Sequence, residues 1–190
     1  MKVFKYHVGI DPAWKNLGLA IVKEEIQTGE LTLLASYVMN PSEYKTIPEF
    51  IKKVLDVVDD DLHKDVCSGE PEVTGAIDSV TIERFVAYAG VSTSETENIC
   101  MIIGALQYAF KEQYWIDSLM LRAIDWKTNL VKQLFKTQGF DNPSTKLDKK
   151  FSLAAGNACL KQSKNVFATD HQADATCLAS YSAVMKRKAK

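Results

Sequence analysis

Carboxylate side chains occur in this sequence at three points where an apolar segment ends or a helix is expected to begin. Asp11 ends the apolar segment "VGID", Glu83 ends the segment "VTIE", and Asp174 follows His171 by three residues. Carboxylates that are forced together repel one another unless a cation joins them. Oxygen ligands with one imidazole suit hard cations such as Mg²⁺ and Mn²⁺. A pair of such ions about 3.5–4 Å apart is the usual arrangement for hydrolysing a phosphodiester.

Each of these residues also has an ordinary structural explanation. Asp11 precedes a proline and could simply open a turn, and Glu83 could pair with the arginine that follows it. Asp174 could serve the dipole of a helix N-terminus, and a single histidine such as His171 is more often a loop residue than a ligand. Taken one at a time, these explanations are the simpler ones. Taken together, in this order and on these segments, the four side chains indicate a metal site.

The elements that position these residues can be predicted from the spacing of the apolar residues. Segments 2–10, 17–22 and 30–39 are joined by short turns, which predicts three strands in an antiparallel meander. Further strands are expected at 78–85 and 118–123, and helices at about 47–62, 93–114, 125–135, 147–160 and 172–186. Strands followed by alternating strands and helices predict an α/β layer fold with a mixed sheet.

Several helix starts can be predicted from capping residues. Ser94 and Glu97 have the spacing of a capping box for the helix at 93–114. Asp125 is placed to be the N-cap of the following helix. Asp170 is expected to cap the last helix, because it lies one residue too early to share a face with Asp174.

The composition is typical of one globular domain spanning residues 1–190. Hydrophobic residues make up 46% of the chain, and no repeat, linker or low-complexity tract divides it. No segment approaches the roughly 20 apolar residues of a membrane helix and no signal peptide is visible, so no membrane association is expected. The four cysteines are scattered without a CxxC pair, which predicts free thiols and a cytoplasmic location.

The net charge of −1 hides an asymmetry between the two parts of the chain. Residues 1–117 hold 10 Lys and Arg against 19 Asp and Glu, a net charge of −9, whereas residues 118–190 hold 13 against 5, a net charge of +8. A basic half can follow phosphates while the acidic half lies elsewhere or in a metal site. The alternative is an ordinary solvated surface with a flexible basic tail at about 186–190.

Taken together, the acidic motifs resemble those of the RuvC family of Holliday-junction resolvases, within the RNase H-like nucleases. The family's opening motif matches Gly9-Ile10-Asp11-Pro12, its second motif matches Ile82-Glu83, and its last motif matches His171 and Asp174. The resemblance implies an RNase H-like mixed five-stranded sheet flanked by helices. It implies that Asp11, Glu83, His171 and Asp174 are catalytic and bind two Mg²⁺ ions, for which Mn²⁺ can substitute. The expected activity is cleavage of four-way or other branched DNA by paired nicks.

The resemblance also implies a homodimer. The helix at 93–114 corresponds to the family's dimer helix, and Met101, Ala105 and Tyr108 flank its apolar stripe. These three residues are the candidates for a symmetric contact, and two active sites related by symmetry could nick two strands of one junction.

The expected DNA contacts come from two basic segments and one loop. "DWKTNLV" and "DKKFSLA" resemble the family's DNA-binding segments, which points to Lys127 and to Lys149 or Lys150. Lys127 is expected to share an exposed basic stripe with Lys132 and Lys136, the stripe continuing through Lys146. Phe85 and Tyr88 follow Glu83, where an aromatic ring could stack on an unpaired base. A core position is the alternative for Phe85.

The sequence departs from the family pattern at two points. Ala13 replaces the usual glycine after the proline, and the loop at 136–145 is long. These departures favour the phage-encoded branch of the family, whose enzymes act in the bacterial host cytoplasm.

Three alternative functions must be weighed against the resolvase. The Asp-ended hairpin also resembles the first phosphate loop of actin-like ATPases, but no second glycine-rich phosphate loop follows Glu83, which argues against an ATPase. A second alternative is another RNase H-like nuclease acting on RNA or on other DNA structures. A third is a catalytically silent scaffold that binds branched DNA.

Overall fold

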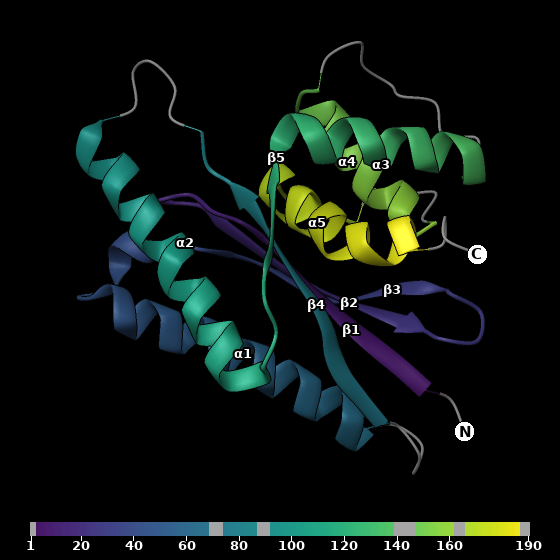
Figure 1. Ribbon diagram of the computed structural model, residues 1–190, viewed down its shortest axis with the longest axis horizontal. Coiled ribbons are helices and arrows are strands. Elements are labelled where there is room, and N and C mark those ends of the chain that lie inside the picture. The colour runs from purple at the N-terminus through teal and green to yellow at the C-terminus, as the bar shows by residue number, and fades with distance from the viewer. Residues whose placement is uncertain (1–2, 69–73, 87–91, 139–146, 162–165, 187–190) are drawn as a thin grey trace.

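The computed structural model describes residues 3–68, 74–86, 92–138, 147–161 and 166–186, and Figure 1 shows its architecture. One five-stranded sheet has the strand order β3-β2-β1-β4-β5. Its strands are β1 (Val3–Asp11), β2 (Leu17–Glu25), β3 (Leu31–Met39), β4 (Thr74–Arg84) and β5 (Leu119–Arg122). The helices are a 3-10 turn η1 (Pro41–Glu43), α1 (Ile47–Ser68), α2 (Thr93–Tyr114), α3 (Ala123–Gln138), α4 (Lys149–Cys159) and α5 (Asp170–Lys186).

The sheet is mixed, which confirms the fold class predicted from the sequence. β1, β2 and β3 form an antiparallel meander, whereas β4 runs parallel to β1 and β5 runs parallel to β4. The parallel pairing of Ile10 with Ile82 places the carboxyl ends of β1 and β4 at the same end of the sheet. Asp11 and Glu83 therefore lie on neighbouring strands, close to that end.

Helices cover both faces of the sheet (Figure 1), and each face contributes to a separate apolar core. Tyr6, Val8 and Ile10 alternate along β1 and are fully buried in a core that α1 and α2 complete. Gly9 lies between them in sequence and contacts α5 on the opposite face. Figure 1 shows α3, α4 and α5 on that face, where they enclose a second core around Trp126.

The N-cap of α2 differs from the prediction. The cap is Ser92 rather than Ser94, because the Ser92 hydroxyl accepts a 3.2 Å hydrogen bond from the Glu95 amide. Ser92 has the extended backbone of an N-cap, whereas Ser94 already lies within the helix. The predicted capping box is therefore wrong by two residues, although the bounds predicted for the helix are confirmed.

The starts of α3 and α5 also differ from the predictions. α3 begins two residues before Asp125, which lies in the first turn and accepts a 2.6 Å hydrogen bond from Arg122. α5 begins at Asp170, and the Thr169 hydroxyl accepts a 3.3 Å hydrogen bond from the Gln172 amide, as an N-cap does. Neither aspartate is the N-cap, because each already has a helical position, where its charge still suits the helix dipole.

Three broader expectations can be compared with the structure. In the ranges described above, every helix is too short or too polar to cross a membrane. The four cysteines are free thiols, two exposed and two buried, as predicted. A single domain over residues 1–190 stays a prediction, and the basic tail beyond residue 186 lies outside the described residues.

Candidate functional site

Two glycines allow α5 to approach the end of β1 closely. A Cβ atom at Gly9 would overlap the backbone of Ala175, and one at Gly18 would overlap the carbonyl oxygen of His171. Gly18 is also the residue that pairs with Asp11 across β1 and β2. The first turn of α5 therefore lies directly beside Asp11. Any residue other than glycine at these two positions would prevent this close approach.

Asp11 and His171 contact each other at this end of the sheet. His171 Nδ1 lies 2.8 Å from Asp11 Oδ2, and the two side chains are 31% and 14% exposed. This hydrogen bond raises the pKa of the imidazole, burial lowers it, and the negative charge of Asp11 raises it further. The structure thus brings together Asp11 and His171, two of the four residues that the sequence analysis assigned to the site.

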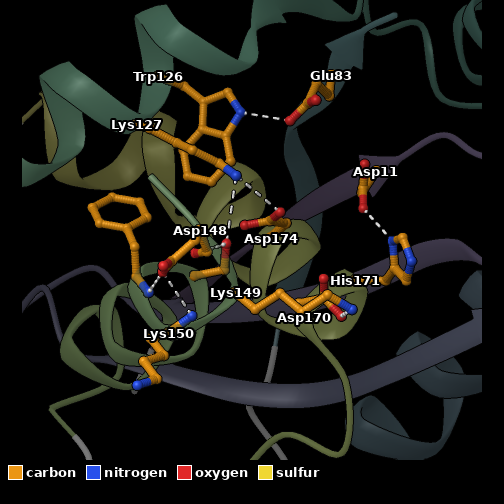
Figure 2. Close-up of polar contacts among 12 residues, drawn as sticks. Asp11, Glu83, Trp126, Lys127, Asp148, Lys149, Lys150, Asp170, His171 and Asp174 are labelled. Carbon is orange, nitrogen blue, oxygen red and sulfur yellow. Dashed lines mark hydrogen bonds and ion pairs between the residues drawn. The ribbon is translucent and has the colours of Figure 1, made fainter. Parts of the chain in front are cut away.

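Glu83 lies near the end of β4, on the strand next to Asp11. Its carboxylate Oε2 accepts a 2.8 Å hydrogen bond from the indole Nε1 of Trp126 (Figure 2). Burial raises the pKa of Glu83 to about 7, with a further contribution from the charge of Asp11 and a smaller one from Asp174. The hydrogen bond from Trp126 acts in the opposite direction. At neutral pH, therefore, Glu83 is poised between its neutral and charged forms.

Asp174 lies on α5, one turn beyond His171. Its Oδ2 atom accepts a 3.2 Å hydrogen bond from Lys127 Nζ, and both side chains are largely buried, with 14% and 12% exposed. Its Oδ1 atom is buried and has no hydrogen-bond partner among the described residues. Burial raises the pKa of Asp174, the ammonium of Lys127 lowers it, and the charge of Asp11 raises it again. Burial lowers the pKa of Lys127, but Asp174 and the other carboxylates outweigh burial and raise it.

The donor set fits a hard divalent cation, although the side chains do not enclose one in this arrangement. The negative charge of Asp11 raises the pKa values of Glu83 and Asp174, and among the described residues Asp174 Oδ1 is a buried acceptor without a donor. Across the described residues, no three His, Cys, Asp or Glu side chains are grouped closely enough to hold a metal ion. Two carboxylate oxygens are instead occupied by His171 and Lys127. The metal centre therefore stays a prediction, and these two contacts would have to open.

Lys127 does not lie where the predicted basic stripe requires it. Its ammonium points into the site, where it contacts Asp174 and Ser152 Oγ at 3.2 and 3.4 Å (Figure 2). Lys132 and Lys136 are exposed on the same helix. The helix face that carries Lys127 packs against α5, so the three lysines do not form one exposed stripe although their helical spacing suggested it.

The other expected DNA contacts have mixed positions. Lys149 and Lys150 begin α4 and are exposed, and Lys149 Nζ lies 3.3 Å from Asp170 Oδ1. Phe85 is half-buried and packs against the core beneath α1 and α2, so the core alternative accounts for its position. Tyr88 lies outside the described residues.

Sequence reasoning missed Trp126, Gly9 and Gly18 as components of the site. Trp126 precedes Lys127 in "DWKTNLV", and a tryptophan beside a lysine predicted to be near DNA was the available signal. The two glycines lie within otherwise apolar strands, where glycine often marks close approach of another backbone. A tryptophan beside a lysine and a glycine within a strand are both too common in sequences to have identified the contacts of Trp126, Gly9 and Gly18.

A hollow of about 490 Å³ opens beside the site. Its lining includes Glu83 and Lys127 on the polar side and Val86, Ile124 and Leu147 on the apolar side. These three apolar side chains are each more than a third exposed. The hollow is large enough to admit part of a nucleotide next to the carboxylates.

The comparisons with known proteins bear on the fold. No protein-family model matches the sequence, and no curated protein matches it significantly. The structure is similar to that of RuvC from T. thermophilus in complex with a Holliday junction substrate, with a TM-score of 0.65 and 19% identity over 99% of this chain and 96% of that chain. A second Thermus thermophilus RuvC structure gives a TM-score of 0.62 and 20% identity over 100% of this chain and 97% of that chain.

A eukaryotic structure is also similar. The yeast mitochondrial Holliday junction resolvase Ydc2 gives a TM-score of 0.53 and 17% identity, covering 95% of this chain and 78% of that chain. None of these structures supports the phage-encoded branch. The chain has the RNase H-like fold of the RuvC-type resolvases, as its acidic motifs predict.

Proposed function

We propose that this protein is a metal-dependent endonuclease that cleaves four-way or other branched DNA junctions by paired nicks. The observation that carries the proposal is the grouping of Asp11, Glu83, His171 and Asp174 at one end of the sheet, on a fold shared with RuvC. Each of these side chains has its pKa raised or raises that of a neighbour, which is the behaviour expected of a site built to receive a cation.

The four side chains would hold Mg²⁺, or Mn²⁺ in its place. Two such ions, when bound, supply a nucleophilic water and neutralise charge on the leaving oxygen. Trp126 donates to Oε2 of Glu83, so Oε1 is the oxygen that would carry the proton of the neutral form and that would lose it on binding a cation. Lys127 is positioned to donate to a phosphate oxygen once its contact with Asp174 opens.

The charge distribution favours DNA approach from the layer formed by α3, α4 and α5. Exposed lysines of α3 and α4 lie on this side. The opposite layer contains α1, whose sequence "LDVVDDDLHKD" supplies five of the aspartates that make the first half of the chain acidic. Tyrosine hydroxyls bind three of them, through the pairs Tyr37–Asp61, Tyr6–Asp65 and Tyr114–Asp59. The sheet therefore lies between this acidic helix and the exposed lysines of α3 and α4, an arrangement that would orient an anionic polymer towards the site.

We further propose a homodimer through the outer face of α2. Met101 and Tyr108 are 60% and 68% exposed there, and Gly104 between them has open space above it. Ala105 packs partly against the core and is the weakest of the three predicted contacts. Sedimentation at micromolar concentration should give twice the mass of the 21.2 kDa chain. A monomer that still makes paired nicks would exclude the dimer.

A comparison of substrates tests the proposed function. A synthetic four-way junction, a fork and a linear duplex are incubated with the protein, with and without Mg²⁺. We expect Mg²⁺-dependent nicks in the junction, and no cleavage by Asp174→Asn protein, which should still bind the junction. Preferential cleavage of an RNA–DNA hybrid would favour another RNase H-like nuclease. Junction binding without cleavage in any divalent metal would favour the silent scaffold. The expected cellular location is the cytoplasm, where the four free thiols persist.

A further inference from the structure

We propose that Trp126 is a positioning residue that holds the Glu83 carboxylate in the orientation needed to bind the metal ion. This inference rests on the proposed function. Its basis is the 2.8 Å hydrogen bond from Trp126 Nε1 to Glu83 Oε2, which joins α3 to β4 across 43 residues of sequence. Glu83 then has one oxygen fixed by the indole and the other available to a cation.

The packing of Trp126 makes its N–H a rigid donor. The side chain is fully buried, in the same core as Leu130 and Leu134 of α3. A buried indole N–H requires an acceptor, and a packed ring can present that N–H in only one direction. The carboxylate of Glu83 is the acceptor, so the position of the ring determines the position of Oε2.

The neighbouring residue of α3 acts on a second carboxylate. Lys127 Nζ lies 5.1 Å from the centre of the Trp126 ring and 3.2 Å from Asp174 Oδ2 (Figure 2). Two consecutive residues of one helix therefore contact carboxylates of β4 and α5. The two donors differ in charge. The ammonium of Lys127 competes with a cation for the site, whereas the indole N–H of Trp126 is uncharged and does not.

Trp126→Phe protein tests the inference, because phenylalanine keeps an aromatic ring but has no N–H. The readout is the dissociation constant for Mg²⁺ and Mn²⁺, measured by calorimetry on the DNA-free protein at pH 8. Loss of a residue that orients a metal ligand typically weakens metal binding about 10- to 100-fold. We expect a loss in this range, whereas unchanged or tighter metal binding would overturn the inference.

Two control variants separate positioning from simple loss of packing. Leu130→Ala creates a cavity in the same helix and the same core but leaves the hydrogen bond from Trp126 to Glu83 in place. Trp115→Phe makes the same chemical change at a side chain that is 91% exposed. Both control proteins should bind metal with wild-type affinity. This should hold even if Leu130→Ala lowers the midpoint of unfolding as much as Trp126→Phe does. A parallel loss of metal binding in Leu130→Ala would mean that the effect is structural, which contradicts the inference.

Glu83→Gln distinguishes failure of this inference from failure of the proposed function. If Glu83→Gln leaves metal affinity unchanged, Glu83 is not a ligand and the proposed site is wrong. If Glu83→Gln weakens binding but Trp126→Phe does not, only the role of Trp126 is wrong. In the double variant, Trp126→Phe should cause no further loss, because its effect acts through Glu83.

Fluorescence provides a second measurement that does not require the Trp126→Phe protein to fold. The chain has three tryptophans, so Trp14→Phe/Trp115→Phe protein retains Trp126 as its sole indole. Saturating Mg²⁺ should change the emission of that indole, with the same dissociation constant as calorimetry gives, and Glu83→Gln should abolish the change. An emission spectrum that does not respond to bound Mg²⁺ would contradict the inference.

Discussion

Glu83→Gln should stabilise the metal-free protein while removing a metal ligand. Glutamine keeps an oxygen that can accept the hydrogen bond from Trp126, but it carries no charge. Burial and the nearby carboxylates raise the pKa of Glu83 from 4.5 to about 7 in the folded protein. The folded state therefore holds a proton between these pH values that the unfolded state has released. Folding stability must fall as pH rises from 4.5 to 7 and then level off.

The size of the effect follows from this difference. At about 1.4 kcal/mol per pKa unit, keeping Glu83 charged in the folded protein costs on the order of 3 kcal/mol at pH 8. At pH 4 the carboxyl is mostly protonated in both states, and the cost is less than about 0.5 kcal/mol. Glu83→Gln removes this cost, so the variant should be more stable than the wild type by roughly 3 kcal/mol at pH 8 and nearly equal to it at pH 4.

Urea unfolding of both proteins in EDTA, at pH 4 and pH 8, measures the two differences. Saturating Mg²⁺ should then reverse the order at pH 8, because only the protein with the complete site gains binding energy. Equal stability of the two proteins at pH 8 would refute the reasoning, as would a gain of the same size at pH 4. Either result would mean that the charge on Glu83 is not unfavourable in the folded protein.

Three further predictions concern α5, the DNA surface and the imidazole. Gly9→Ala should destabilise the protein by about 1–3 kcal/mol or more, because the added Cβ overlaps the α5 backbone. Gly104→Ala, where the space is open, should be neutral or stabilising, and equal effects of the two changes in urea unfolding would contradict this. Lys149→Ala/Lys150→Ala should reduce the slope of log affinity against log salt for a four-way junction by up to about two units, and an unchanged slope would exclude both phosphate contacts. His171→Ala should abolish nicking, whereas His171→Asp should retain some, since a carboxylate can bind the same metal; an inactive aspartate variant that binds Mg²⁺ normally would argue against a ligand role.

The order of the elements could be predicted because local patterns determine it. Alternating apolar residues define β1, and apolar residues at helical spacing define the buried face of α2. Asp11 and Glu83 could be placed together because parallel neighbouring strands bring their carboxyl ends to the same edge. The N-cap of α2 was misassigned because Ser92 and Ser94 both have capping side chains, and only the backbone conformation distinguishes them.

The contacts that complete the site could not be predicted because they join distant segments. Nothing in the sequence around Trp126 indicates that its indole meets a carboxylate of β4. The inward position of Lys127 depends on how α3 packs against α5, which helical spacing does not define. The roles of Gly9 and Gly18 likewise depend on the depth at which α5 lies on the sheet. Local patterns thus predict the elements and their carboxylates, and tertiary packing determines the partners of those carboxylates.

A side-by-side comparison of how wild-type and variant proteins cleave a four-way junction tests the central claim most directly. Each strand is labelled in turn at its 5′ end, and the protein is added in Mg²⁺ or in EDTA. We expect wild-type protein to produce nicks in Mg²⁺ alone, and Asp11→Asn and Asp174→Asn proteins to bind the junction with similar affinity but leave every strand intact. Nicking in EDTA, or nicking by either variant at close to the wild-type rate, would contradict a metal-dependent site built on these carboxylates.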